Sequence, residues 1–255
     1  MDPLPRAEDK GRAVRAMFDR IAPRYDALNR VLSLGLDRGW RRLALDAIRV
    51  GPRDRVLDLA CGTGDLAALA AARGATVIGL DFARAMLGGA LERCRGCHLA
   101  QGDAAALPLP DAWATAVTCG FALRNFVSLP PVFVELARVV APGGRIALLD
   151  VDRPDSALMR AGHTLWFDRV VPRVGGWFSD AQAYAYLPRS TVYLPPANEL
   201  RSQLESCGFE RVVLPAGDLI DKVSCGLLEP VLFDWFRSAG SRRRRFGHGA
   251  VDFGG

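Results

Sequence analysis

Short apolar runs alternate with amphipathic stretches along the chain from residue 51 onward. The amphipathic stretches place apolar residues at helical spacing at residues 65–72, 83–94 and 129–140. Strands that alternate with helices form βαβ units, so this pattern predicts a doubly wound α/β fold with a mostly parallel sheet. The apolar runs, which are rich in β-branched residues and bounded by Gly, Pro or Asp, cover residues 55–60, 75–81, 97–103, 115–121 and 144–151.

The chain on either side of this alternation has a different pattern. Phe18, Ile21, Tyr25 and Leu28 recur on one helical face, which predicts helices in the N-terminal part. After the fifth strand we expect an aromatic, mostly helical insertion at residues 155–187, and then a helix near 197–207 and strands near 211–214 and 222–227. We therefore divide the chain into an N-terminal helical cap (1–50), a core domain (51–227) and a C-terminal tail (228–255).

Composition restricts the class of protein. The 255 residues are 50% hydrophobic and 24% charged, which suits a large globular core without disulfide staples. No apolar run approaches the roughly 18 residues that a membrane-spanning helix needs, and the N-terminus lacks the apolar centre of a signal peptide. We expect a cytoplasmic protein whose six cysteines are reduced and pack as small hydrophobic residues.

Charge is concentrated at one end of the chain. The net charge of +5 includes the run Arg242–Arg245, so the rest of the chain carries only about +1 and is not the basic surface of a nucleic-acid-binding protein. In the tail, an apolar segment precedes these arginines. This composition suits peripheral contact with an anionic membrane surface, and it suits equally well packing on the body of the protein or on a partner copy.

The turn after the first predicted strand, VLDLACGTGDLA at residues 56–67, has the composition of a ligand-binding loop. Gly62 and Gly64 permit a tight backbone path close to a ligand, and the free N–H groups that open the next helix favour a carboxylate or phosphate. Thr63 adds a hydroxyl group. In an open α/β sheet the ligand lies beyond the carboxyl ends of the strands, which is where this turn is expected.

Acidic residues at neighbouring strand ends narrow the choice of ligand. Asp81, followed by Phe82, ends the second strand, where a carboxylate can accept two hydrogen bonds from a ribose diol. Asp58 is placed to attract a ligand ammonium group. Asp103 and Ala104 follow the third strand, at a position suited to contact an adenine ring. Ammonium, carboxylate, ribose and adenine together describe S-adenosylmethionine. For any one aspartate, a helix cap or a solvated strand end is the alternative.

The spacing of Gly62, Gly64 and Ala67 also satisfies the pattern of dinucleotide-binding loops. A nicotinamide-dependent oxidoreductase would need a catalytic Tyr-x-x-x-Lys or an equivalent. The only lysines in the chain are Lys10 and Lys222, and neither lies in that pattern.

Several segments resemble the ubiquinone/menaquinone biosynthesis C-methyltransferase family, over about residues 14–214. The resemblance implies a Rossmann-like class I methyltransferase fold with a seven-stranded sheet. It also implies S-adenosylmethionine as cofactor, read by Thr63, Asp81, Asp103 and Ala104, and methyl transfer to a ring carbon of a prenylated quinol such as demethylmenaquinol. We expect no metal ion. The segments are MFDRIAPRYDALNRVLSLGLDRGWRR (17–42), ALPLPDAWATAVTCGFALRNF (106–126), ELARVVAPGGRIALLDVDRP (135–154) and VVPRVGGWFSDAQAYAYLPRS (170–190).

The catalytic residues that the resemblance implies are Tyr25, Arg124 and Asn125. A ring carbon becomes a sufficient nucleophile only as the neighbouring hydroxyl loses its proton. We therefore assign Arg124 to electrostatic stabilisation of the phenolate, Asn125 to orienting a quinol oxygen, and Tyr25 to closing the site from the N-terminal helices. A loop ion pair for Arg124 and plain core packing for Tyr25 are the alternatives.

The chain departs from the family pattern at some positions. Gly120 stands where members commonly carry a serine, so we expect it to contact the cofactor through its backbone. Asp150 and Asp152 stand where a glutamate and a serine are usual, and His163, an alternative general base, stands where a tyrosine is expected. These departures leave a soluble aromatic natural product as an alternative acceptor, and a non-catalytic adenosine-ligand-binding protein as a further alternative.

Overall fold

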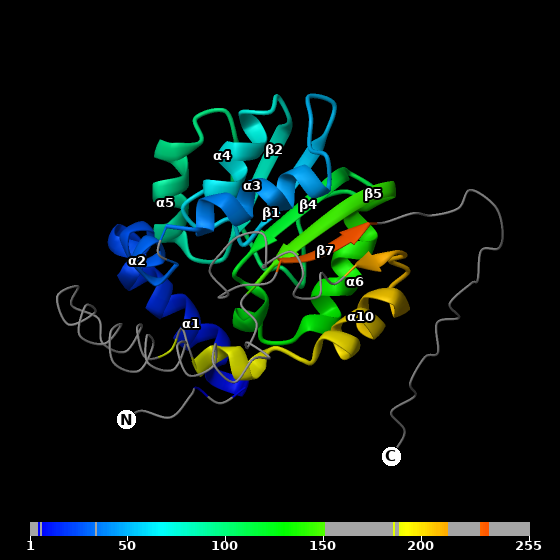
Figure 1. The fold of residues 1–255 in the computed structure, drawn as a ribbon. Helices are drawn as coiled ribbons and strands as arrows, with labels where there is room; N and C mark the ends of the chain where they lie inside the picture. Colours follow the sequence, from blue (N-terminus) through cyan, green and yellow to red (C-terminus); the bar gives the residue numbers. More distant parts are fainter. Residues whose placement is uncertain are drawn as a thin grey trace, which may run out of the picture.

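Five adjacent parallel strands form most of the sheet in the computed structural model, which describes residues 5, 7–33, 35–150, 186, 189–213 and 230–234. These strands are adjacent in the order β3-β2-β1-β4-β5, and each pair is parallel (Figure 1). The mostly parallel α/β sheet predicted from the sequence is confirmed. The strands are β1 (Arg55–Leu59), β2 (Thr76–Asp81), β3 (His98–Gln101), β4 (Ala114–Gly120) and β5 (Val140–Leu149).

Two short strands continue the sheet beyond β5. β7 (Pro230–Asp234) pairs antiparallel with β5 and with β6 (Val212–Val213). Pro230 is the first residue of its strand, a position where a missing N–H is tolerated. The sheet therefore extends beyond residue 227, into the segment expected to be a tail. The strand expected at 222–227, and the insertion expected at 155–187 apart from Tyr186, lie outside the described residues.

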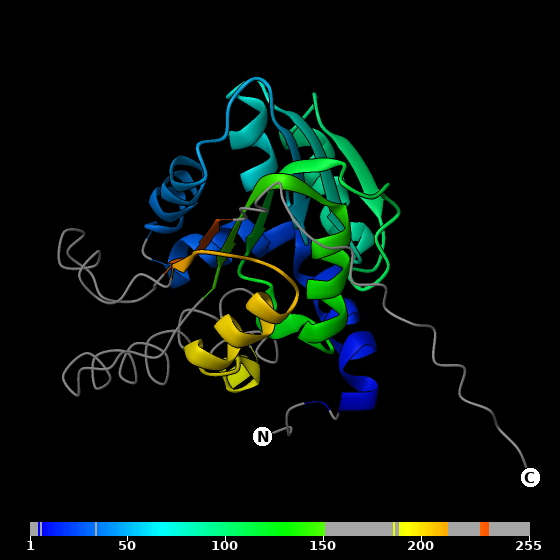
Figure 2. The same ribbon diagram turned by 90° about the vertical axis from the view of Figure 1, so that its right-hand side faces the viewer.

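Helices cover both faces of the sheet because successive side chains of a strand point to opposite faces. Leu57 and Val117 pack with α6 and α10, whereas their neighbours Val56 and Ala116 pack with α3 and α4. Figure 2 shows the helices on the two sides of the sheet. None of the helices in the described part of the chain is long and apolar enough to cross a membrane. The helices are α1 (Ala7–Ile21), α2 (Tyr25–Leu32), α3 (Asp37–Ala47), α4 (Asp65–Ala71), α5 (Arg84–Arg93), α6 (Leu129–Val139) and α10 (Ala197–Ser206), with 3₁₀ turns η1 (Ala22–Arg24), η2 (Leu123–Asn125) and η4 (Ser190–Tyr193).

Helix α1 is fixed to the body of the protein at two places. Met17 packs in one apolar cluster with Met86 of α5. Near the other end of α1, the Nζ of the buried Lys10 donates to the carbonyl oxygen of Phe126 at 2.5 Å and lies 3.9 Å from the centre of the Tyr193 ring. These contacts attach the N-terminal cap both to α5 and to the chain that follows β4.

The turn from β1 into α4 needs a backbone that L-residues rarely adopt. Gly64 has a φ of +84°, and a Cβ at this position would lie 3.1 Å from the Cα of Ala90 in α5. Glycine is required here both by the dihedral angle and by the close approach of two backbones. The second glycine of the predicted ligand-binding loop therefore has a packing role.

Cys94 and Cys97 form a disulfide, so the prediction that all cysteines are reduced is wrong for this pair. Cys94 ends α5, and the N–H of Cys97 donates to its carbonyl oxygen at 3.0 Å. This turn brings the two Cα atoms to 5.4 Å, a separation typical of disulfides. Cys61, Cys119 and Cys207 are free.

Gly88 and Gly89 both lie inside α5, and replacing each by Ala separates helix propensity from packing. A Cβ at Gly88 meets nothing within 4 Å, so Gly88→Ala is expected to raise the free energy of unfolding by about 0.5–1 kcal/mol. A Cβ at Gly89 would lie 3.2 Å from Cγ2 of Thr63, so Gly89→Ala is expected to gain less, or to destabilise. Urea unfolding measures both. Equal gains for the two variants would contradict the close packing of α5 on the glycine-rich turn.

Candidate active site

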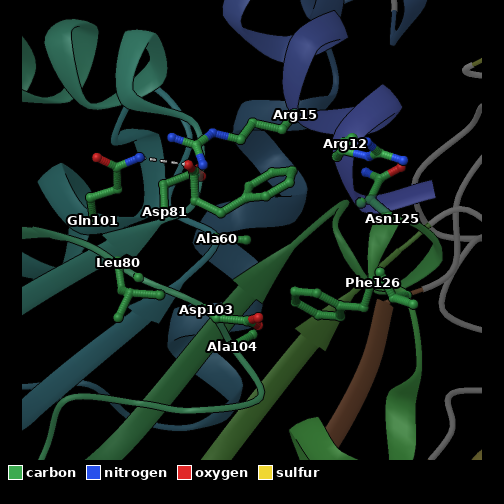
Figure 3. Close-up of a pocket in the computed structure, with 14 residues that line it drawn as sticks. Arg12, Arg15, Ala60, Leu80, Asp81, Gln101, Asp103, Ala104, Asn125 and Phe126 are labelled. Carbon is green, nitrogen blue, oxygen red and sulfur yellow. Dashed lines mark hydrogen bonds between the residues drawn. The ribbon is translucent and has the colours of Figure 1, made fainter. Parts of the chain in front are cut away.

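A cavity of about 680 Å³ lies at the carboxyl edge of the sheet, where open α/β sheets bind ligands. The ends of β1, β2 and β3 and the chain around η2 form its walls, and α1 contributes Arg12 and Arg15 from the other side (Figure 3). The structure thus brings together the predicted residues Asp81, Phe82, Asp103, Ala104 and Asn125. The lining consists of Gly11, Arg12, Arg15, Ala60, Leu80, Asp81, Phe82, Gln101, Gly102, Asp103, Ala104, Asn125, Phe126 and Val127.

Asp81 is a buried carboxylate that joins two turns. Its Oδ2 accepts a hydrogen bond from the N–H of Gly62, and its Oδ1 accepts one from the N–H of Ala83, both at 2.8 Å. Burial raises the pKa of Asp81 above its usual value, although the bonds from Ala83 and Gly62 oppose this. A carboxylate has about four acceptor positions, so Asp81 can hold the turn and still accept hydrogen bonds from a ligand.

The wall beyond β3 is also held by hydrogen bonds. Nε2 of Gln101 donates to the carbonyl oxygen of Phe82 at 3.0 Å, and Oδ1 of Asp103 accepts from the N–H of Ala105 at 2.9 Å (Figure 3). Ala104, between Asp103 and Ala105 in the sequence, is buried. This wall joins the ends of β2 and β3 into one surface.

The remaining predicted cofactor residues, Asp58, Gly62, Thr63, Gly64 and Gly120, are not part of the cavity lining. Gly62 still contributes to it indirectly, because its N–H binds Asp81. The others lie at the same edge of the sheet, at the end of β1, in the following turn, and at the end of β4.

Thr63 is engaged with the N-terminal cap. Its hydroxyl donates to Asp26 of α2 at 2.6 Å, and its carbonyl oxygen accepts from Arg93 of α5 at 2.7 Å. Arg93 also pairs with Asp26 and, at 3.2 Å, with Asp65. Burial opposes ionisation of Asp26, but the hydrogen bonds from Arg93 and Thr63 hold its pKa below the usual value. The network locks the glycine-rich turn between α2 and α5.

Asp58 is buried at the end of β1 with one oxygen unused. Its Oδ1 accepts from the hydroxyl of Thr118 at 2.8 Å, whereas its Oδ2 has no hydrogen-bond partner. Burial raises the pKa of Asp58 to about 7, against the opposing effects of the Thr118 bond, the charge of Arg41 and the backbone N–H of Ala67. A buried carboxylate with a free oxygen is a receptor for a cation, as the ammonium prediction requires.

Arg124 and Asn125 form a buried polar cluster beside the cavity. The guanidinium of Arg124 pairs with Asp150, and its Nε donates to the hydroxyl of Ser190 at 3.1 Å. The hydroxyl of Tyr186 donates to Oδ1 of Asn125 at 3.2 Å. Asn125 also lines the cavity, so the cluster adjoins the predicted cofactor site.

Tyr25, the first residue of α2, is half-buried and faces the same region. A Cβ at Gly62 would lie 3.8 Å from its ring, so the ring packs on the glycine-rich turn. Burial raises the pKa of the Tyr25 phenol, and the charges of Arg41 and Arg124 lower it. The Tyr25 phenol therefore lies within range of the charge of Arg124, and its catalytic role stays a prediction.

Some residues of this region were not selected from the sequence pattern. Asp26 lies in the resembling segment 17–42 and could have been selected there, but Arg93 has no motif, and no pattern predicts a contact between two residues 67 positions apart. Tyr186 and Ser190 lie at the end of the resembling segment 170–190 and could have been selected there. His163, the alternative base, lies outside the described residues.

Comparison with known proteins identifies the family. Residues 6–216 match the model of the ubiE/COQ5 methyltransferase family. The chain is 46% identical to a demethylmenaquinone methyltransferase of Deinococcus radiodurans, over 81% of this chain and 89% of that protein. It is 39% identical to the ubiquinone/menaquinone biosynthesis C-methyltransferase UbiE of Geobacter sulfurreducens, over 80% and 83% of the two chains.

Solved structures support the fold alone. A SAM-dependent methyltransferase from Aquifex aeolicus superposes with a TM-score of 0.56 at 15% identity, covering 82% of this chain and 98% of the other. The [4+2]-cyclase SpnF superposes with a TM-score of 0.52 at 21% identity, covering 69% and 58%. Because proteins with different reactions share this fold, the assignment depends on the sequence match and the site. The family match covers the N-terminal helices, the glycine-rich turn and the Arg124 cluster, and the chain belongs to the ubiE/COQ5 methyltransferase family.

Proposed function

We propose that the protein transfers a methyl group from S-adenosylmethionine to a ring carbon of a prenylated quinol such as demethylmenaquinol, in quinone biosynthesis. The family match over residues 6–216 carries this proposal, because the matched range contains both the cavity and the Arg124 cluster beside it. Relatives that are named as methyltransferases of demethylmenaquinone or of ubiquinone/menaquinone biosynthesis support it. The described residues then belong to a class I methyltransferase domain with a seven-stranded sheet, and the insertion expected at 155–187 stays a prediction.

The residues at the carboxyl edge fit the proposed cofactor. Asp81 has acceptor capacity for the ribose hydroxyls, and Asp103 with Ala104 provides the wall for the adenine. The unpaired Oδ2 of Asp58 fits the ammonium group of the methionine part. When bound, S-adenosylmethionine supplies an electrophilic methyl group. The protein must hold the acceptor carbon in line with that group and stabilise the charge that develops on the acceptor.

Arg124 is the residue proposed to stabilise this charge. Its guanidinium is buried and held by Asp150 and Ser190, so its orientation is set before the acceptor binds. A preoriented guanidinium stabilises a phenolate more strongly than water does, because it needs no reorganisation in a dry site. Arg124 does not accept the proton, since a guanidinium remains protonated; a water molecule oriented by it is the proposed acceptor.

Asn125 and the two tyrosines define the rest of the acceptor site. Asn125 is held by Tyr186 and donates through Nδ2 to the carbonyl oxygen of Phe121 at 3.3 Å. Tyr25 packs on the glycine-rich turn and closes the site from α2.

The direct test is to incubate the purified protein with methyl-labelled S-adenosylmethionine and a reduced lipid extract from cells that lack the protein. Mass spectrometry of the quinones is expected to show one labelled methyl group on a ring carbon. Boiled protein and an extract left oxidised serve as controls, since only the quinol has a hydroxyl that can become a phenolate. If the protein binds the cofactor but labels no quinone, the result would favour a soluble aromatic acceptor or a non-catalytic role over the proposed function.

Arg124→Lys keeps a positive charge but loses the planar fork that Asp150 and Ser190 hold. We expect the turnover number to fall by roughly 10²–10³-fold, the cost of losing one preoriented donor, with the dissociation constant for S-adenosylmethionine unchanged. Single-turnover kinetics and isothermal titration calorimetry measure the two quantities. Undiminished turnover in a variant with a normal melting temperature would remove Arg124 from the mechanism.

The buried Asp58 predicts a pH dependence of cofactor binding. Because its pKa is raised to about 7, the carboxylate gains a proton as the pH falls through 7 and can no longer attract an ammonium group. The affinity for S-adenosylmethionine is expected to fall by about tenfold per pH unit below that value. 5′-Methylthioadenosine, which lacks the ammonium group, is the matched control, and an equal loss of its affinity would show that Asp58 is not responsible.

A further inference from the structure

We propose that Arg41 of helix α3 binds the carboxylate of the cofactor's methionine part and so makes the site selective for ligands that carry an amino acid. The proposal rests on S-adenosylmethionine being the cofactor. It names a residue outside the glycine-rich loop and outside the strand ends, contributed by the N-terminal cap.

The position of Arg41 is the first observation. The side chain is buried, and its guanidinium lies 5.1 Å from the centre of the Phe121 ring, directly after β4. A Cβ built on Gly120 would be 3.4 Å from its Nη1. Helix α3 thus delivers a cation to the carboxyl end of β4, next to β1, whose Asp58 lies within range of its charge.

The incomplete pairing of this cation is the second observation. Its Nε lies 3.5 Å from Asp37 and its Nη2 lies 3.6 Å from Asp65, longer than the 2.7–2.9 Å of strong charge-assisted hydrogen bonds. Nε has no hydrogen-bond partner. A buried guanidinium with an unused donor is costly unless another group completes its shell. A carboxylate is the group whose geometry suits a guanidinium best.

The third observation is that Asp58 has an unused acceptor, just as Arg41 has an unused donor. Its Oδ2 is buried without a partner, and the ion pairs of Arg41 in the described part of the chain are with Asp37 and Asp65, not with Asp58. An α-amino acid carries its ammonium and its carboxylate on one carbon atom. One unused acceptor and one unused donor at neighbouring strand ends fit that pair of charges.

Gly120 explains how the guanidinium fits. A side chain at this position would meet Leu66 Cδ1 at 2.8 Å and Arg41 Nη1 at 3.4 Å. The absence of a side chain therefore leaves space for Arg41 at the end of β4. The guanidinium therefore supplies the polar group at this end of the site.

The test compares ligands that differ only in the carboxylate. S-Adenosylmethionine and its decarboxylated form share the adenosine, the sulfonium and the ammonium group. For Arg41→Met, isothermal titration calorimetry is expected to show a loss of affinity for S-adenosylmethionine of about 10- to 100-fold, the range for a hydrogen bond to a charged group. The loss for the decarboxylated form is expected to be smaller, because there only the effect of Arg41 on the pKa of Asp58 is removed. Arg42→Met, at the exposed neighbouring position of α3, is the matched control and is expected to change neither.

Two further measurements make the outcomes separable. If Arg41→Met fails to fold because Asp37 loses its partner, Arg41→Lys keeps the charge and is expected to show a smaller loss for the same ligand only. Equal losses for both ligands, or no loss, would overturn the carboxylate contact. If the unaltered protein binds neither ligand, then the cofactor assignment itself fails, and the proposal fails with it.

Discussion

The carboxylate of Asp81 is the point on which the geometry of the site depends. It accepts one backbone N–H from the turn after β1 and another from the turn after β2, and it does so while buried, where a lost hydrogen bond is most costly. Since a carboxylate has about four acceptor positions, the group that shapes the site can also bind the ligand. A ligand diol would then complete the shell of Asp81 without breaking the bonds that hold the two turns.

The N-terminal cap contributes as much to the geometry of the site, because it supplies charged side chains as well as helices that cover the sheet. Asp26 binds Thr63 of the glycine-rich turn, Arg41 reaches the end of β4, and Lys10 attaches α1 to the carbonyl oxygen of Phe126. Each of these contacts joins the first 50 residues to a strand end or a turn of the sheet. The cap therefore completes the site, and the bare sheet would lack both the lock on the glycine-rich turn and the cation beside Asp58.

Much of this fold could be predicted because local patterns determine it. The alternation of short apolar runs and amphipathic stretches placed β1–β5, α4, α5 and α6 within a few residues. Strand ends then placed Asp81 and Asp103 at one edge. The contacts of Asp26, Arg93 and Arg41 could not be predicted, because they join residues far apart in the chain and depend on how α2, α3 and α5 pack. The Cys94–Cys97 disulfide could not be predicted from composition, because it depends on the turn after α5 that brings the two Cα atoms to 5.4 Å.

Proteins that catalyse different reactions share this fold. The chemistry therefore depends on side chains that the fold does not require. The pair of Arg124 and Asp150 is such a case. A buried ion pair adds little net stability, because the loss of hydration offsets the attraction between its charges. Its position beside a cavity-lining residue is better explained by what it holds in place. Asp150 and Ser190 fix the plane of the guanidinium, and Tyr186 fixes Asn125 next to it. A cation with a set direction, in a site with little water, is what a reaction that develops negative charge on a ring oxygen needs.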